Sequence, residues 1–465
     1  MVTLLTLCGH VVFDVVFGWT LLSFHQHQRS WTETLFLSVL FGMYVETLSI
    51  ATLMFLGVSL LAAGLWTAAG MGALTVSAVC WGRLHYSPVC VQQPKWYEWA
   101  LMASVGEKMV FAVWQLTRTP TYFDDALAHW SGRARSLFGE VNWSFDPASS
   151  LFLGGNIGNR NYPLQTVIWR AISAKLNGEW NEIISRADGL IFFIVIVGTI
   201  WLAVWRFSNL RWVAAAAAFV VSAVPLHAWH AAAGYSDIAV EAFVVAALAA
   251  LLRAEWFVGG VMAAGAIWSK NDALVLYFPS LLVAAGLLQM PYKTFQLRWR
   301  NMDRFLSGFA TIGPWLIFNY IHGLGITPGQ SEVAWHRDAP GLLWAALMKS
   351  PTSSTLWISI LACLIFSGDA MFKDTTGRAL IFAFLISLCG IVLTFSSTSA
   401  YQFLADETTI HRVMMQFSGM AIVVATFSLW LKCKEGYKTG PSRKWRRVVE
   451  GENQNATAKF RSRFT

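Results

Sequence analysis

Long apolar stretches separated by short polar segments dominate this 465-residue sequence and limit what it can fold into. A helix needs about 20 apolar residues to cross a bilayer, and about 13 stretches come near that length. Hydrophobic residues make up 56% of the chain and charged residues only 13%, compared with about a quarter in soluble domains. The pattern excludes disordered, coiled-coil and ordinary soluble proteins. It predicts an all-α polytopic membrane protein.

The expected spans have lengths close to the thickness of the bilayer. The two at 237–253 and 255–269 are short, and we expect them to be tilted or to cross only half of the membrane. The full set lies near residues 3–23, 34–56, 59–81, 99–117, 189–206, 212–229, 237–253, 255–269, 273–289, 305–321, 354–371, 379–396 and 413–431.

Basic residues distinguish the two sides of the membrane. The loops on one side, with the C-terminal segment, hold 22 Lys and Arg residues, and those on the other side hold 10. The positive-inside rule places the richer side in the cytoplasm. Segment 432–465 supplies +7 of the net charge of +8, so it is expected to be a basic cytoplasmic tail, solvated or attracted to anionic lipid. The loop 118–188 is then external, and periplasmic in a bacterium. A pI of 9.2 that comes from a tail gives no reason to expect a nucleic-acid partner.

The external loop carries much of the polar chemistry. Its first part predicts a helix from Asp125 to Leu137, with Asp124 and Asp125 in the first turn. Capping and the helix dipole explain one acidic residue there better than two adjacent ones. A second stretch, from Tyr162 to Leu176, is mildly amphipathic and is expected to lie along the membrane interface. Loops this long are usually functional.

Further ionisable residues fall at span ends on the same expected side. They occur in Tyr235-Ser236-Asp237, Lys270-Asn271-Asp272, Trp335-His336-Arg337-Asp338 and His411-Arg412. Ionisable groups at membrane depth are costly and are candidates for function. Each also has a structural interpretation, most plainly Lys270 as an ion-pair partner of Asp272 or Asp237. Asp14 and Glu46, in the first two spans, are interpreted as packing polar residues without a role.

Four of these motifs resemble those of the bacterial GT-C-type membrane glycosyltransferases. Asp125-Ala126, Trp130 and Arg133-Ala134 resemble a "W-D-A-x-x-x-W-x-x-K-A" element, and Tyr162-Pro163-Leu164 resembles the start of a juxtamembrane helix. Gly234-Tyr235-Ser236-Asp237 is similar to "G-Y-A-D", and Lys270-Asn271-Asp272 to "K-N-E". The family includes enzymes similar to the aminoarabinose transferase of lipid A and the protein O-mannosyltransferases. The resemblance places N-terminal hydrophobic segments at 1–98 and a catalytic core at 99–431, before the tail at 432–465.

The resemblance implies an inverting glycosyltransferase that moves a sugar from a polyprenyl-phosphate donor to a lipid, glycan or protein acceptor, outside the bacterial inner membrane. Asp125 is expected to be the base, with Asp124 assisting it. The expected phosphate-binding residues are Arg412, Lys270, Arg160, His336 and Arg337. The expected sugar- or acceptor-binding residues are Tyr235, Asp237, Asp272 and Tyr162. This chemistry requires no metal or other cofactor, although an acidic pair can bind a divalent ion.

Two other classes remain open. A transporter or flippase of a lipid-linked sugar would use Lys270 and Asp272 as gating charges. An O-antigen ligase or polymerase would also have many spans and a long external loop, but would depend more on Arg and His than on an early Asp pair.

Overall fold

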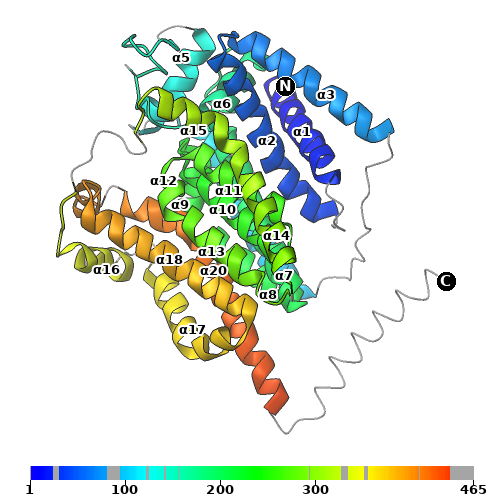
Figure 1. Ribbon diagram of the computed structural model, residues 1–465, viewed down its shortest axis with the longest axis vertical. Coiled ribbons are helices and arrows are strands. Elements are labelled where there is room, and N and C mark those ends of the chain that lie inside the picture. Colours follow the sequence, from blue (N-terminus) through cyan, green and yellow to red (C-terminus); the bar gives the residue numbers. More distant parts are fainter. Residues whose placement is uncertain are drawn as a thin grey trace.

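The computed structural model describes residues 2–24, 31–80, 95–121, 125–140, 143–155, 157–292, 294–325, 333–349, 354–407 and 409–439 (Figure 1). Within these ranges the chain is mainly α-helical, and its β pairing is limited to an isolated bridge between Ser144 and Phe152. The all-α prediction is therefore confirmed.

The helices follow one another with short connections over most of the chain. In order they are α1 (Val2–Ser23), α2 (Trp31–Phe55), α3 (Leu60–Cys80), α4 (Trp96–Arg118), the π-helix η1 (Ala126–Gly132), α5 (Arg133–Gly139), α6 (Gln165–Asn177), the 3-10 turn η2 (Ile184–Arg186), α7 (Ala187–Ser208), α8 (Arg211–Ser222), α9 (Pro225–Ala233), α10 (Asp237–Leu252), α11 (Trp256–Ser269), α12 (Asp272–Leu276), α13 (Phe278–Leu288), α14 (Phe295–Phe309), the 3-10 turn η3 (Ala310–Ile312), α15 (Gly313–Ile321), α16 (Ala339–Lys349), α17 (Ser354–Lys373), α18 (Thr375–Ser397), α19 (Tyr401–Ala405) and α20 (Ile410–Thr439).

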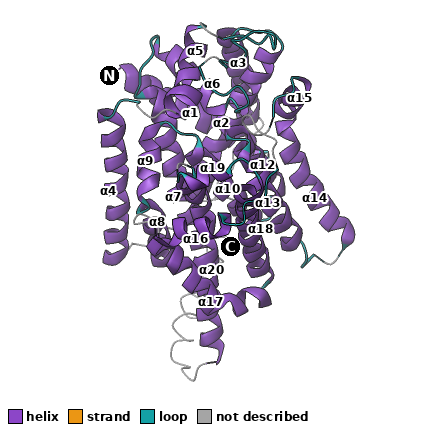
Figure 2. Ribbon diagram, turned by 90° about the vertical axis from the view of Figure 1, so that its left-hand side faces the viewer, coloured by secondary structure: helices purple, strands orange, loops and turns teal. Residues whose placement is uncertain are grey.

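Several helices are compatible with an integral membrane protein. Among the described residues, seven are long and apolar enough to cross a bilayer, namely α1, α2, α3, α7 with η2, α17, α18 and α20. A bent pair, α8 and α9, makes an eighth if it is counted as one span. Figure 2 shows α4 along one side of the bundle, where large side chains such as Phe111 and Trp114 are exposed.

Prolines divide three of the expected spans. The span expected at 212–229 bends by 61° between α8 and α9, where Pro225 opens α9. Pro279 and Pro314 similarly lie in the first turns of α13 and α15. A proline in a helix interior lacks the amide hydrogen and clashes with the preceding turn, whereas the first turn accepts it. The span expected at 305–321 is thus made of the end of α14, η3 and α15.

The segment before that break is also helical, contrary to the expected loop. Helix α14 begins at Phe295 and includes Arg298, Arg300 and Arg304, all of which are exposed. Its polar residues are concentrated on one side, while Phe305 and Gly308 pack inward. Arg300 and Arg304 therefore lie on the outer face of an amphipathic helix, whereas Arg298 donates to the backbone carbonyl oxygens of Met290 and Tyr292 ahead of the helix.

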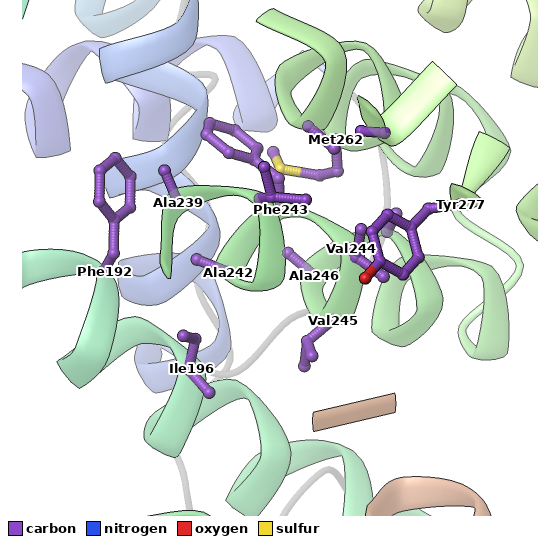
Figure 3. Packing of buried hydrophobic residues seen from close by; sticks show 14 of the residues in the cluster. Phe192, Ile196, Ala239, Ala242, Phe243, Val244, Val245, Ala246, Met262 and Tyr277 are labelled. Atoms are coloured by element: carbon purple, nitrogen blue, oxygen red, sulfur yellow. The ribbon is translucent and has the colours of Figure 1, made fainter. Parts of the chain in front are cut away.

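Helix α10 forms the centre of the bundle. Apart from Asp237 and Glu241 it is apolar around its whole circumference, which requires neighbours on all sides. Helices α7, α11 and α20 contact it, and Figure 3 shows Phe192 of α7 and Met262 of α11 near Phe243 of α10. The fixed position of α10 matters for function because its first residue is Asp237.

Helix α6 corrects the expected interfacial helix at Tyr162–Leu176. It starts at Gln165, and every residue from Gln165 to Ala174 is buried, because α1, α2, α3 and α5 pack around it (Figure 1). Two of its polar side chains pair inside the bundle, Arg170 with Asp188 and Ser173 with His10. The amphipathic pattern thus reflects internal polar contacts.

Two glycines let α1 and α2 cross with their backbones in contact. A Cβ atom added at Gly18 would overlap the carbonyl oxygen of Ser38, and one added at Gly42 would overlap that of Asp14. The crossing also brings the residues one helical turn from each glycine to the same interface. Asp14 on α1 and Glu46 on α2 are among them.

We expect Gly18→Ala to destabilise the protein by about 1–3 kcal/mol, the usual cost of overpacking. Gly9→Ala is the matched control in the same helix, since a Cβ atom there meets nothing within 4 Å. Thermal unfolding of the two detergent-purified variants measures the change in stability that each substitution causes. Equal melting temperatures for the two variants would contradict this account of the crossing.

Candidate functional site

A network of ion pairs joins the external loop to the core. Arg412, near the start of α20, donates through Nη1 to Asp125 and through Nη2 to Oδ2 of Asp237, at 2.9 Å. The side chains range from 37% exposed for Asp125, through 15% for Arg412, to fully buried for Asp237. Asp125 is thus the carboxylate that an entering molecule meets first.

Lys270 is the second cation of this network. Its Nζ lies 3.2 Å from Oδ1 of Asp237 and 2.9 Å from Oδ2 of Asp272. Gln416 completes the shell by donating to Oδ1 of Asp237 at 2.6 Å. Asp237 therefore accepts from three side chains, and its role is to hold the two cations in place. The name "cation cluster" is used below for Asp125, Asp237, Lys270, Asp272 and Arg412.

Helix ends at one face of the bundle position these residues. Asp237 begins α10, Asp272 begins α12, and Lys270 follows the last residue of α11. Helix N-termini favour negative charge, since their amide groups carry a partial positive charge. The turn before α10 uses Gly234 in a left-handed conformation (φ +86°), and the carbonyl of this glycine accepts from Arg170. A buried ion pair of Arg170 with Asp188 fixes that turn further.

Aromatic residues surround the cations. The guanidinium carbon of Arg412 lies 4.3 Å from the centre of the Tyr235 ring, and the His230 ring packs on the same tyrosine at 4.9 Å. Both ring nitrogens of buried His230 lack a hydrogen-bond partner among the described residues. Burial raises the pKa of Tyr162 to about 12, so its phenol stays protonated.

Two residues of the segment 269–272 bind to the external loop. Ser269 donates to Gln165, and Asn271 donates to the carbonyl oxygen of Asn161 at 2.7 Å. Trp315 in turn donates to Asn271 at 3.3 Å. The expected ion pairs of Lys270 with both Asp272 and Asp237 are present.

His129 lies beside the expected base. Its Nδ1 accepts from the backbone N–H of Asn159 at 2.9 Å, so a neutral ring carries its proton on Nε2. That nitrogen lies 3.7 Å from Oδ1 of Asp125. Burial lowers the pKa of His129 below its ordinary value of 6.5, although Asp125 opposes the shift.

A lowered histidine pKa makes stability fall on acidification. The full contribution of neutral His129 is present above about pH 6.5 and is lost as the pH falls towards the folded-state pKa, because the unfolded chain takes up the proton first. We expect the melting temperature of His129→Gln to decrease less than that of the wild type between about pH 8 and pH 5. If the melting temperatures of the variant and the wild type change with pH in parallel, a lowered pKa of His129 is contradicted.

Other expected site residues lie outside the cation cluster. Arg160 and Arg337 are exposed and form no ion pair within the described ranges. His336 instead stacks on Tyr401 at 3.9 Å, and Tyr401 donates to Asp338. These three residues were expected to bind phosphate, but among the described residues none forms a hydrogen bond or ion pair with Arg412 or Lys270. Asp124 lies outside the described residues.

Arg133 also has a structural place. It is fully buried and donates to the backbone carbonyl oxygens of Leu153 and Tyr162, at 2.9 and 3.2 Å. It therefore ties the π-helix and α5 to the rest of the external loop.

Sequence reasoning missed Gln416, His129 and His230. Two of them follow a predicted site residue by four positions, Gln416 after Arg412 and His129 after Asp125. That spacing places both members of a pair on one helix face and would have identified them. His230 gives no such signal, because its position beside Tyr235 depends on the left-handed turn at Gly234 that ends α9.

A second polar layer lies one turn deeper than Asp237. Glu241 accepts from His227 at 2.6 Å and from the backbone N–H of Gly419 at 2.8 Å. All of its partners come from α9 and α20, so this layer joins the helices beneath the cation cluster.

The chain matches no protein-family model, no curated protein and no solved structure. The functional argument therefore depends on the residues and their geometry.

Proposed function

We propose that the protein is an inverting GT-C-type glycosyltransferase that uses a polyprenyl-phosphate sugar. One observation carries the proposal: Asp125 of the expected external loop pairs with Arg412, and the buried carboxylate of Asp237 holds both Arg412 and Lys270 in position. A general base and fixed positive charges are the two requirements of sugar transfer from a phosphate leaving group.

The reaction follows from these roles. The acceptor hydroxyl oxygen attacks the anomeric carbon, and its proton passes to a carboxylate oxygen of Asp125. The bond from the anomeric carbon to the phosphate oxygen breaks, and its electron pair leaves with the lipid phosphate. Arg412 and Lys270 stabilise the negative charge that develops on the phosphate as this bond breaks. Arg412 offers a planar fork of donors and Lys270 a point charge.

In-line displacement requires the base and the phosphate to lie on opposite sides of the sugar. The direct contact of Asp125 with Arg412 is therefore a closed state, and donor binding must separate the two side chains. The π-helix that starts after Asp125 suits such a movement, since its wider turns often occur at functional sites.

The proposed location is the bacterial inner membrane, with the cation cluster on the periplasmic side and the tail in the cytoplasm. The distribution of basic residues supports this orientation. The acceptor would be a lipid, a glycan or a protein in the cell envelope, and membrane lipids would deliver the donor.

Proteoliposomes containing the full-length protein and a radiolabelled polyprenyl-phosphate hexose test the proposal. Addition of lipid, glycan and peptide acceptors should release polyprenyl phosphate and place the label on one acceptor class with inverted anomeric configuration. If the intact donor instead crosses the bilayer without losing its sugar, the protein is a flippase and the enzyme proposal is wrong. Transfer from a diphosphate-linked oligosaccharide alone would favour a ligase or polymerase.

A further inference from the structure

A second group of ionisable side chains lies between α1, α2 and α6. His10 and Asp14 come from α1 and Glu46 from α2, and they are 4%, 1% and 5% exposed. Among the described residues, none of the three forms a hydrogen bond or ion pair with the cation cluster, and the proposed sugar transfer does not use them. They lie well inside helices that are apolar enough to cross a membrane.

The three side chains point at one another. Nε2 of His10 lies 3.0 Å from both carboxylate oxygens of Glu46. One oxygen of Asp14 accepts from the indole of Trp169 at 3.1 Å, while the other, Oδ1, has no hydrogen-bond partner among the described residues. One nitrogen of His10 and one oxygen from each acid lie within 4.8 Å of one another.

The helix register produces this arrangement. His10, Asp14 and Gly18 are four residues apart in turn and share one face of α1. On α2, Gly42 and Glu46 have the same spacing. Because the two glycines allow the backbones to touch, the acids one turn away are brought together.

The charges of this group do not balance. Two carboxylates face one imidazole, and no lysine or arginine pairs with any of them within the described ranges. A buried charge without a counter-charge is strongly destabilising. A divalent cation bound by a neutral imidazole and two carboxylates gives a net charge of zero.

We propose that His10, Asp14 and Glu46 form a binding site for a divalent transition-metal ion of the zinc class. A mixed set of one imidazole and two carboxylates suits zinc, manganese or iron(II). Two ligands four residues apart on a helix is a spacing that helical zinc sites use.

The surroundings of His10 fit this role. Nδ1 of His10 lies 2.9 Å from Oγ of Ser173, and the ring stacks on Trp169 at 5.0 Å. A metal-binding histidine usually donates its second N–H to such a partner, which directs the other nitrogen to the ion. Ser173 and Trp169 both belong to α6, so the ion joins the first two helices to the helix that bears Arg170 and Gln165.

The test uses full-length, tag-free protein purified in detergent from zinc-supplemented cells. Elemental analysis should find about one zinc ion per chain. Protein from zinc-depleted cells should gain thermal stability when zinc is added. Cobalt substitution should give the visible absorption of a metal bound to nitrogen and oxygen, a readout that needs no variant.

Two variants and a matched control locate the ion. Asp14→Asn and Glu46→Gln should each weaken zinc binding by more than about tenfold, since even the partners of metal ligands contribute tenfold or more. Glu241→Gln removes another buried, histidine-paired carboxylate and should retain the zinc. If the wild type holds no zinc, manganese or iron and none of these ions raises its melting temperature, the proposal is wrong and protons balance the charge. Equal zinc content in all variants would also overturn it.

Discussion

Asp125→Asn should reduce sugar transfer by about 10²- to 10⁴-fold, the usual contribution of a general base. Asparagine keeps the shape of the side chain but cannot take up the acceptor proton. Folding should change little, because the ion pair with Arg412 is partly exposed and such pairs contribute at most about 1 kcal/mol. Initial rates of label transfer in proteoliposomes, with melting temperatures alongside, measure both effects.

Glu140→Gln is the matched control for this experiment. Glu140 pairs with Lys175 at 3.3 Å in the same loop, outside the cation cluster. Loss of the Glu140 charge should leave the rate of sugar transfer unchanged. Normal turnover by Asp125→Asn would remove Asp125 from the role of base, whereas loss of activity in both variants would indicate a general effect on the loop.

Arg412→Ala should lower donor use by about 10²- to 10³-fold, the effect of removing one group that stabilises developing negative charge. Asp237 would keep Lys270 and Gln416 as partners, so we expect the bundle to remain folded. Arg412→Lys should recover only part of the activity, because an ammonium group cannot bridge two carboxylates in the fork of a guanidinium.

Steady-state kinetics with varied donor concentration separate binding from chemistry. A role in phosphate stabilisation requires a decrease in kcat/KM for the donor, and a lower kcat identifies an effect on the transition state. Arg135→Ala, which removes an exposed arginine of α5, serves as the control. Unchanged donor kinetics in Arg412→Ala would exclude Arg412 from the phosphate site.

Sequence patterns predicted the helical class and the core of the candidate site. Asp125 and Arg412 are 287 residues apart, yet both were expected on one side of the membrane near the ends of spans. Alternation of spans is enough for that inference, because each crossing changes the side of the next loop. Lys270 and Asp237 were expected for the same reason, and their ion pair is present.

The sequence could not predict which charged loop residues pack together. His336 was placed with the phosphate-binding residues because it lies on the expected side, but contacts with Tyr401 position it elsewhere. Lateral position within a membrane face depends on helix packing, to which hydropathy gives no guide. The covered position of α6 was missed for the same reason, since burial by α1 to α3 is a tertiary effect.

The close crossing of α1 and α2 also has a consequence for biosynthesis. His10 and Glu46 are only 36 residues apart, but Ser173 follows His10 by 163 residues. At about 5 to 20 residues per second, the ribosome needs roughly 10 to 30 s to supply the α6 partners. During that interval the nascent hairpin holds its acids without Trp169 or Ser173. The two glycines therefore act first in time, by keeping the hairpin closed until the rest of the chain arrives.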